Sequence, residues 1–526
     1  MSYLDNINSP ADVKKLNLKE LEALAEEIRS AILNRDSKIG GHVGPNLGIV
    51  ETTIALHYVF NSPEDKIVYD VSHQSYPHKI LTGRKNGFLT DEGMRKISGY
   101  TTPAESEHDH FIVGHTSTSV SLACGLAKAR DLKGEKHNVI AVIGDGSLSG
   151  GEALEGFDNA AVLNSNIIII VNDNEMSIAE NGNLRLLRQT GGKAECNMFK
   201  ALGFDYRYLE EGNDIAKLTS LMKEVKDTDK PTVLHIHTEK GKGYKPAEEH
   251  KETWHWSVPF DIASGNPTID LSGENYNSIT VNYLQEKIAK DKKVVLINAG
   301  TPGAIGMTPD MRQKFGRNFV DVGIAEEHGV AMASALAKGG CKPVFWVLSS
   351  FVQRTYDQIT QDLCIDSNAA TIVTFWGSVY GMNDVTHLGL QDIPMMSNIP
   401  NLVYLAPTTK EEYLAMLDWS IEQKEHPVAI KLPSGEVISD GKEVTKDFSI
   451  LNKYEMTRKG SKVAIVGLGT FYGLGNDVAD LMKEKAGIDA TVINPYYITG
   501  LDEEMLEDLK KDLPKTVTVH FGEGEK

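Results

Sequence analysis

Several features are scarce or absent in this sequence of 526 residues, and each absence excludes a class of protein. The four cysteines, Cys124, Cys196, Cys341 and Cys364, show no close spacing, which argues against a CxxC zinc or redox site and against a disulfide framework. We therefore expect reduced thiols. No apolar stretch approaches about 18 residues, so we expect no transmembrane helix. The start of the chain lacks the basic region and apolar run of a secretory signal.

Positive charge is also in the minority. The formal net charge is −19, which argues against nucleic acids and anionic membranes as partners, because both select basic surfaces. Hydrophobic residues make up 41% and charged residues 24% of the chain, the proportions of a soluble globular protein, so the cytoplasm is the expected location. The chain is too long for one core, and about two to four domains are expected.

Helices and short strands are predicted to alternate along the first part of the chain. Apolar residues at helical spacing predict a helix over residues 11–34, and the glycine-rich segment 40–48 follows it. Buried parallel strands are short and rich in Val and Ile. The pattern predicts a doubly wound α/β domain over residues 1–265. Its strands are expected at 67–71, 139–143, 167–171 and 232–236.

Two further alternating segments follow. Residues 262–278 are rich in Gly, Ser, Asn and Pro and are predicted to form a linker. The next domain is expected over 279–445, and a third over 455–526. The third has few strands for a doubly wound domain, so we expect it to be short or truncated. The second domain's strands are expected near 293–297, 343–347, 370–375, 402–405 and 427–431, and the third domain's at 463–466, 490–493 and 516–520.

Two polar residues follow neighbouring apolar runs in the first segment. Asp145 ends the run 139–143, and Asn174 comes 29 positions later, after the run 167–171. This spacing fits strand, crossover helix, strand, so both residues should lie at the carboxyl edge of a parallel sheet, where such sheets bind ligands. A carboxylate and an amide oxygen suit Mg²⁺, which keeps waters and takes diphosphate oxygens as further ligands. The pairing predicts a diphosphate cofactor held through a metal.

Three histidines, His42, His73 and His115, lie in glycine-rich loops or after expected strands of the same segment. A lone histidine is more often structural, but three near one sheet edge favour a site. No zinc pattern such as HExxH accompanies them. We expect them to transfer protons and to bind a polar substrate.

Two later motifs are open to more than one interpretation. Glu326 follows the strand-like segment 318–322 and precedes a helix of small residues, so it either caps that helix or is a buried acid with a raised pKa. Gly467-Leu-Gly469 follows a strand as a dinucleotide fingerprint would. The next strand, however, ends in Asn494-Pro495 without the acidic residue that holds a ribose. A structural turn is therefore the preferred interpretation there.

Eight motifs carry a resemblance to a known family. They lie at 40–48, 69–84, 114–119, 144–146, 172–178, 240–248, 323–326 and 351–358. Together and in this order they resemble the thiamine-diphosphate enzymes of the transketolase superfamily, and within it the 1-deoxy-D-xylulose-5-phosphate synthases. The likeness runs over about residues 10–520 and implies a fold of three α/β domains of the transketolase type and a homodimer.

The resemblance also implies roles for individual residues. Mg²⁺ would be held by Asp145, Asn174 and the carbonyl group of Met176, and Glu326 would hydrogen-bond the pyrimidine ring of thiamine diphosphate. Residues implied to line the diphosphate and thiazolium side are His73, Gly114, His115, Thr116, Gly146, Ser147, Lys240 and Tyr244, with Asn174 shared. Ile324 and Phe351 would shape the aminopyrimidine pocket, while His42, His255 and His387 would move protons and orient the substrates.

The sequence departs from the family where the family binds the phosphate of its aldehyde acceptor. The family's Asp-Arg-Ala-Gly turn corresponds here to Phe375-Trp376-Gly377-Ser378, its Tyr-Pro-Arg-Gly to Leu432-Pro433-Ser434-Gly435, and Pro103 stands where a further arginine is expected. Each lost charge-assisted contact costs about 1.5–3 kcal/mol, so losing two lowers affinity about a hundredfold or more. Only about 25 residues separate Ile178 from Gly203, which implies a reduced lid.

These observations leave three functions open. The first is a carboligase that joins pyruvate, with decarboxylation, to glyceraldehyde 3-phosphate or a related aldehyde. The lost arginines suggest a different or unphosphorylated acceptor, or a phosphate held by other residues such as Arg354 or Lys242. The second is a transketolase-like transfer from a ketose donor. The third is a non-catalytic cofactor-binding paralogue, against which the retained Glu326 and histidines argue.

Overall fold

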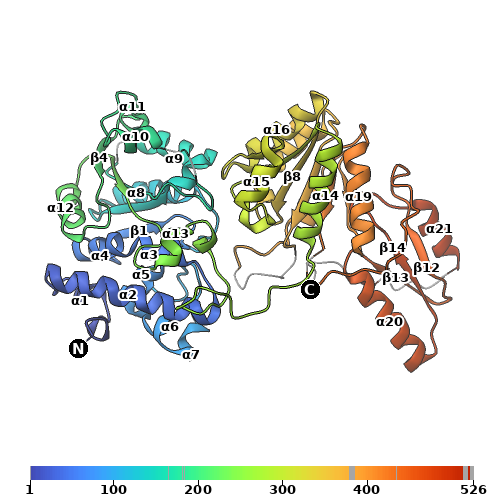
Figure 1. Ribbon diagram of the computed structural model, residues 1–526, viewed down its shortest axis with the longest axis horizontal. Helices are drawn as coiled ribbons and strands as arrows, with labels where there is room; N and C mark the ends of the chain where they lie inside the picture. Colours follow the sequence, from blue (N-terminus) through green and yellow to red (C-terminus); the bar gives the residue numbers. More distant parts are fainter. Residues whose placement is uncertain are drawn as a thin grey trace. The chain divides into compact units, whose positions relative to one another are not determined.

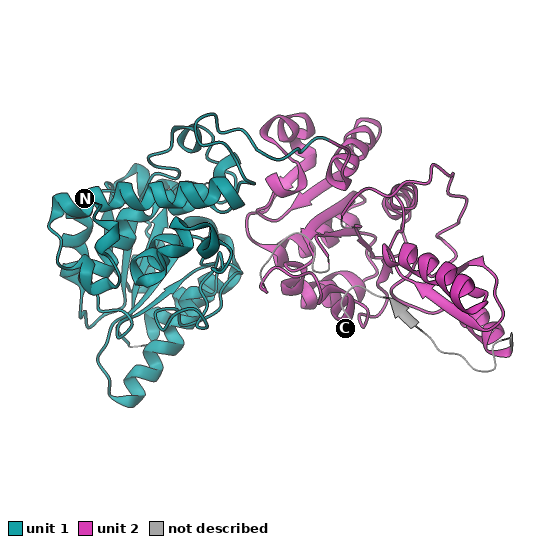
Figure 2. Ribbon diagram, turned by 90° about the horizontal axis from the view of Figure 1, so that it is seen from below, with its two compact units in different colours: residues 1–272 teal, residues 273–526 magenta. Residues whose placement is uncertain are grey.

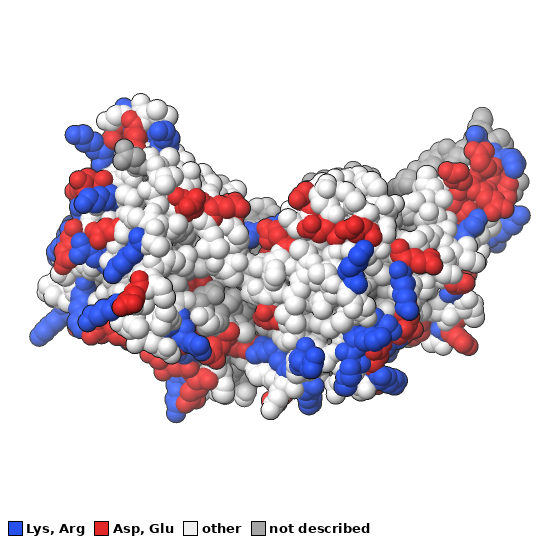
Figure 3. Space-filling model, turned by 90° about the horizontal axis from the view of Figure 1, so that it is seen from above, with Lys and Arg blue, Asp and Glu red and all other residues white. Residues whose placement is uncertain are grey.

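The computed structural model describes residues 2–163, 165–180, 182, 184–377, 385–433, 435–512 and 519–521. They divide into two compact units, residues 1–272 and residues 273–526 (Figure 2). Among the described residues, none of the helices combines the length and apolar character needed to cross a bilayer. All four cysteines are free thiols. On the face shown in Figure 3, acidic and basic side chains are interspersed.

The first unit is built on a five-stranded parallel sheet with the strand order β1-β2-β3-β5-β4 (Figure 1). The strands predicted in this unit are confirmed to within two residues at each end. Strand β4 was missed because it is an edge strand whose sequence, DYRYL, is largely polar. The strands are β1 Lys66–Tyr69, β2 Val139–Gly144, β3 Ile168–Asp173, β4 Asp205–Leu209 and β5 Thr232–His237.

Helices cover both faces of this sheet. Helices α8 and α9 pack on one face around Phe157, and α4 and α12 pack on the other around Leu56 and Met222 (Figure 1). The helices are α1 Pro10–Val13, α2 Leu18–Ile39, α3 Val43–Gly48, α4 Val50–Val59, α5 Tyr76–Lys79, α6 Asn86–Leu89, α7 Asp91–Met94, α8 Ser119–Lys133, α9 Gly151–Val162, α10 Arg185–Gln189, α11 Met198–Leu202, α12 Ile215–Val225 and α13 Lys245–Glu249.

The single helix predicted over residues 11–34 is wrong in its bounds. The chain forms the short α1 and then α2, which continues to Ile39. The break has a local cause: the Asn17 side chain accepts the backbone N–H of Glu20, while the Glu20 side chain accepts the N–H of Asn17. This capping box starts a new helix at Leu18.

The second unit holds two sheets. A six-stranded parallel sheet has the order β10-β11-β9-β8-β6-β7, and a four-stranded sheet has the order β12-β14-β13-β15. Among the strands that the structure describes in this unit, only β12 runs antiparallel to its neighbour. The strands are β6 Val294–Asn298, β7 Phe319–Asp321, β8 Lys342–Leu348, β9 Thr371–Phe375, β10 Val403–Leu405, β11 Val428–Lys431, β12 Glu455–Arg458, β13 Val463–Gly467, β14 Ala490–Asn494 and β15 Val519–Phe521.

The α/β class with mostly parallel sheets is confirmed. The third predicted domain contains the small sheet, whose edge strand β12 was missed because only Met456 and Arg458 in it are even half-buried. The predicted boundaries at 265, 279, 445 and 455 stay predictions. The helices of this unit are α14 Tyr276–Lys290, α15 Pro309–Phe315, α16 Glu326–Lys338, α17 Tyr356–Gln358, α18 Asp392–Met396, α19 Lys410–Glu422, α20 Phe471–Ala486 and α21 Glu503–Asp512.

Candidate active site

The structure brings Asp145 and Asn174 together at the carboxyl edge of the first sheet. Strands β2 and β3 are parallel neighbours, with Gly144 opposite Asn172. The backbone N–H of Asn174 donates to Asp145 Oδ1 at 3.4 Å, and Asn174 Oδ1 accepts the N–H of Met176 at 3.1 Å. Both side chains are buried. The arrangement gathers oxygen ligands of the kind Mg²⁺ prefers.

The loop that carries Met176, residues 174–179, is tightly folded, and we call it the metal-site loop. Glu175 has a left-handed φ of +66°, and the N–H of Ser177 donates to the carbonyl of Ala179 at 2.8 Å. A Cβ atom at Gly146 would lie 2.9 Å from the Cα of Ser177, so only glycine permits this approach. Among the described residues no group of three or more His, Cys, Asp or Glu could hold a metal. A metal here would therefore depend on amide, carbonyl and ligand oxygens beside one carboxylate.

A carboxylate at the end of β1 fixes the Gly114–Thr116 turn. Asp70 accepts the backbone N–H of Ser117 at 2.9 Å and that of Ser119 at 3.0 Å. Gly114 is buried, and His115 and Thr116 are partly exposed, which leaves these two residues accessible to a ligand. The sequence did not single out Asp70, although an acidic residue directly after an expected strand is a usable signal.

Three histidines form a cluster. The ring centroids of His42 and His73 lie 5.0 Å apart, those of His42 and His255 5.6 Å, and those of His73 and His255 5.3 Å. Asn46, which is fully buried and was not singled out, donates from Nδ2 to the carbonyl oxygens of His42 and His73, both at 2.7 Å. One side chain thus sets the position of two histidines.

Lys240 joins this cluster to the metal-site loop. Its Nζ donates to the Ser177 carbonyl at 3.0 Å and lies 3.1 Å from His255 Nδ1. Burial lowers the pKa of Lys240 to about 7, against the opposing effect of Asp145. Burial also lowers the pKa of His255 well below its ordinary value, and Lys240 and His73 add to this. A buried ammonium of this kind favours an anionic ligand.

Tyr244 lies in a different environment from the other predicted cofactor residues. Its ring packs in an aromatic group with Trp254 and Phe260, at centroid distances of 5.0 and 6.1 Å. Its hydroxyl donates to the Ile262 carbonyl at 2.9 Å. These contacts account for the burial of Tyr244 by packing alone.

The short segment after Ile178 is anchored beside the metal-site loop. Arg188 on α10 donates from Nη1 to both carboxylate oxygens of Asp173, at 2.7 and 2.8 Å. Asp173 also lies 2.8 Å from Nε2 of the buried His235. This network holds the last residue of β3, directly before Asn174.

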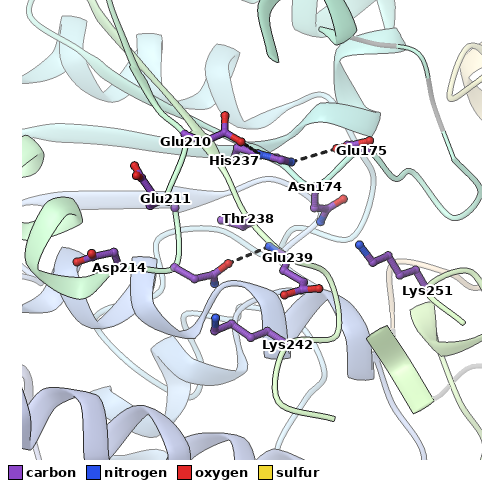
Figure 4. A pocket seen from close by; sticks show the side chains of 12 residues that line it. Asn174, Glu175, Glu210, Glu211, Asp214, His237, Thr238, Glu239, Lys242 and Lys251 are labelled. Atoms are coloured by element: carbon purple, nitrogen blue, oxygen red, sulfur yellow. Dashed lines mark hydrogen bonds and ion pairs between the residues drawn. The ribbon is translucent and has the colours of Figure 1, made fainter. Parts of the chain in front are cut away.

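A cavity of about 500 Å³ opens at the carboxyl ends of β3, β4 and β5. Figure 4 shows His237 between Glu175 and Glu210, with both ring nitrogens 3.1 Å from carboxylate oxygens. The cavity shares Asn174 with the predicted metal site but is lined by none of the three clustered histidines. Its lining residues are Asn174, Glu175, Glu210, Glu211, Gly212, Asn213, Asp214, His237, Thr238, Glu239, Lys242 and Lys251.

In the second unit Glu326 is the first residue of α16 and is 2% exposed. Its Oε2 atom is buried and has no hydrogen-bond partner among the residues that the structure describes. Burial raises the pKa of Glu326 to about 7, against the opposing effect of Arg354. A helix cap that faced solvent would keep an ordinary carboxylate, so the structure favours the buried acid over the cap.

The loop before Glu326 is fixed by Asp321. Its Oδ1 accepts the N–H groups of Gly300 and Gly323 at 2.9 and 3.0 Å. Both glycines have left-handed φ values, and a Cβ at Gly300 would lie 2.8 Å from Cγ1 of Ile324. Ile324, which is predicted to shape the pyrimidine pocket, is thereby held in one position.

Phe351 and His387 also come together. Their ring centroids lie 5.5 Å apart, and Thr386 Oγ1 lies 2.8 Å from His387 Nδ1. Trp376 takes a left-handed φ of +53° and packs edge-on against Phe375 at 5.5 Å. The other departures in this unit, Ser378 and Ser434, lie outside the described residues. In the first unit Pro103 is exposed.

Comparison with known proteins gives the family. The family model described as 1-deoxy-D-xylulose-5-phosphate synthase matches residues 4–190 and 183–238. The transketolase pyrimidine-binding domain matches 275–438, and the transketolase C-terminal domain matches 452–523. A transketolase structure from Pichia stipitis is 16% identical, with a TM-score of 0.41, over 94% of this chain and 90% of that one.

Whole-length relatives agree with these matches. The 1-deoxy-D-xylulose-5-phosphate synthase of Heliobacterium modesticaldum is 38% identical over 98% of this chain and 86% of its own length. That of Alkaliphilus oremlandii is 39% identical over 96% of this chain and 87% of its own length. The chain therefore belongs to the 1-deoxy-D-xylulose-5-phosphate synthase family, and it is an enzyme of the transketolase type.

Proposed function

We propose that this protein is a thiamine-diphosphate- and Mg²⁺-dependent carboligase that decarboxylates pyruvate and joins the two-carbon unit to an aldehyde. The observation that carries the proposal is Glu326, a buried acid with a pKa near 7 and an oxygen for which the described part of the chain offers no hydrogen-bond partner. Such an atom is costly unless a ligand satisfies it. A pyrimidine ring nitrogen is a suitable partner.

The residues of the first unit fit a diphosphate group held through a metal. Asp145, Asn174 and the Met176 carbonyl would hold Mg²⁺, and the Gly114–Thr116 turn and Lys240 would hold the diphosphate. The fit is supported by the oxygen ligands gathered around Asp145, by the close approach that Gly146 permits, and by the buried ammonium of Lys240. When bound, thiamine diphosphate supplies a carbon nucleophile and an electron sink for cleaving a bond beside a carbonyl group.

The chain's own groups would then handle protons and orientation. Glu326 would hold or release a proton at its unpartnered oxygen, which a pKa near 7 permits at neutral pH. His42 and His255 would hydrogen-bond the donor and acceptor oxygens, and Asn46 holds the backbone carbonyl groups of His42 and of the neighbouring cofactor residue His73. Phe351 and His387 would form an apolar wall with one polar edge.

The acceptor is proposed to differ from the family's phosphorylated aldehyde, because Trp376 and Ser434 replace two of its arginines. Neither indole nor hydroxyl supplies the planar fork that binds phosphate. The alternative in which Arg354 or Lys242 holds the phosphate predicts a normal KM for glyceraldehyde 3-phosphate. Trp376→Arg is the informative variant, and Trp376→Phe controls for loss of the indole.

Donor and acceptor profiling of the purified protein with thiamine diphosphate and Mg²⁺ tests the proposal. We expect CO2 release from pyruvate and product formation with unphosphorylated aldehydes, and Trp376→Arg should lower the KM for glyceraldehyde 3-phosphate at least fivefold. A low KM of the wild type for that substrate would overturn the changed acceptor. Ketol transfer from a ketose without CO2 release would support transketolase chemistry instead, and cofactor binding without turnover would support a non-catalytic paralogue.

A further inference from the structure

A buried ionic cluster ties the segment 76–84 to the loop 98–118, outside the residues predicted to bind the cofactor. Its centre is Asp109, whose side chain is fully buried. Arg84 donates to both Asp109 oxygens, at 2.6 and 2.9 Å, and Thr102 donates its backbone N–H at 2.9 Å. His78 Nε2 lies 2.9 Å from the same carboxylate.

A second carboxylate completes the cluster. The Glu105 carboxylate accepts hydrogen bonds from Lys79 Nζ at 2.5 Å and from the backbone N–H of Ser98 at 2.6 Å. Arg84 Nη1 also lies 3.4 Å from this carboxylate. Two carboxylates thus balance two cations, as buried charges require. Burial lowers the pKa of Lys79 to about 8, against the opposing effect of Glu105. We call His78, Lys79, Arg84, Glu105 and Asp109 the clamp.

The clamp matters because the loop it grips has no regular secondary structure to fix its course. Between α7, which ends at Met94, and α8, which begins at Ser119, the chain forms neither helix nor strand. Side chains must therefore set its course. Thr101 donates its N–H to Ser72 Oγ at 2.9 Å, and Ser72 Oγ donates to the Val113 carbonyl at 2.8 Å, so the two ends of the loop close on one hydroxyl.

Both ends of the loop reach the candidate active site. Near its start the Tyr100 ring lies 5.9 Å from the ring of His42. Its end is the Gly114–Thr116 turn, which is fixed through Ser117 by Asp70. A shift in the middle of the loop would therefore move a wall beside a clustered histidine and the turn predicted to hold diphosphate.

We propose that Asp109 and Glu105 are positioning residues that, through the clamp, place the Gly114–Thr116 turn for binding of the cofactor diphosphate. The inference rests on the proposed function for the identity of that ligand. A buried ion pair contributes little net stability compared with an apolar replacement, but it specifies one arrangement of the groups it joins. The clamp is expected to act on the geometry of the loop rather than on the reacting atoms.

The test uses Asp109→Asn in the full-length protein, with Glu107→Gln as matched control, since Glu107 is an exposed acid in the same loop. Calorimetry measures thiamine diphosphate binding in the presence of Mg²⁺, and backbone deuterium uptake is followed in the cofactor-free protein. We expect Asp109→Asn to raise the dissociation constant at least tenfold and to speed exchange over residues 98–118 but not over β2. Glu107→Gln should change neither.

A second variant keeps the inference testable if Asp109→Asn does not fold. Glu105→Gln removes the carboxylate nearer the rim, which is 18% exposed, and should raise the dissociation constant three- to tenfold with the same local exchange. Wild-type affinity in a folded clamp variant would overturn the inference. If the wild-type protein binds no thiamine diphosphate, the proposed function fails. In that case the deuterium-exchange data alone test whether the clamp holds the loop. Unchanged protection of residues 98–118 in both clamp variants would show that it does not.

Discussion

The candidate sites of the two units are built on opposite principles. In the first unit, polar groups contact one another in a network. It joins Lys240, the metal-site loop and the clustered histidines His42, His73 and His255. In the second unit, Glu326 is a single acid with an oxygen that no described residue hydrogen-bonds. Yet burial drives Lys240 and Glu326 toward the same pKa, about 7, from opposite sides.

The difference teaches what each site requires. The proposed binding of a diphosphate needs several donors and metal ligands already held in place, and the polar groups of the first unit are held by short contacts with one another. Exchanging a proton near neutral pH needs one group whose charge is disfavoured, and burial alone provides that. Variants of the two units should therefore have different effects. A variant of Glu326 in the second unit should lose turnover, and variants in the first unit should lose cofactor binding.

The largest effect is expected from Glu326→Gln. The amide keeps the size of the side chain but cannot exchange a proton, so kcat should fall about a thousandfold or more. Thiamine diphosphate affinity should fall far less, and thermal stability should not drop, because no buried acid remains. Steady-state kinetics, calorimetry and thermal unfolding give the three values. Glu327→Gln is the neighbouring control, and an active Glu326→Gln protein would show that the residue is misassigned.

Asp145→Asn should have the next largest effect, on binding. It removes the carboxylate predicted to bind the metal while leaving an amide oxygen for the N–H of Asn174. We expect the Mg²⁺ concentration needed for half-maximal thiamine diphosphate binding to rise about a hundredfold, because the metal loses its charged ligand. Titration of Mg²⁺ into chelator-treated protein measures it. An unchanged Mg²⁺ requirement would place the metal elsewhere.

The sequence predicted the elements and residues that have a periodic or edge signal. Apolar runs located most of the strands, and the polar residues that follow two neighbouring strands, Asp145 and Asn174, are in contact as the spacing required. Edge strands β4 and β12 were missed because their solvent-facing residues break the apolar run. Periodicity carries no information about such strands.

Other features depend on pairs of residues that are distant in the sequence. Asn46 joins His42 to His73, and Asp109 joins Arg84 to Thr102, but each partner alone is an ordinary polar residue in the sequence. Burial of such residues becomes visible only when both partners are placed. The resemblance named most of the site residues, whereas the residues that hold them in position required the structure.

Lys240→Met should have a moderate effect with a characteristic pH dependence. Lys240 titrates at 10.5 when unfolded and at about 7 when folded, so between these values the unfolded chain binds more protons and the wild type gains stability as the pH rises. The variant lacks this group. Below pH 7 the free energy of unfolding of the variant should therefore exceed that of the wild type by on the order of 3–5 kcal/mol. This difference should vanish by pH 10.5.

Denaturant unfolding at several pH values measures this difference, and calorimetry at pH 7 should show an approximately tenfold loss of thiamine diphosphate affinity. Lys242→Met, two positions along the chain and only partly buried, is the matched control. A stability difference between Lys240→Met and the wild type that does not vary with pH would mean that Lys240 is charged in the folded protein throughout this range.

The smallest effect is expected from Tyr244→Phe, which asks how far the polar network of the first unit extends. Its hydroxyl is already engaged by the Ile262 carbonyl, and its ring packs on Trp254. The variant should lose about 1 kcal/mol of stability, the worth of one hydrogen bond, and should change thiamine diphosphate affinity less than twofold. A tenfold loss of affinity with unchanged stability would instead place Tyr244 among the cofactor's ligands, as the resemblance implied, and would extend the binding network beyond Lys240.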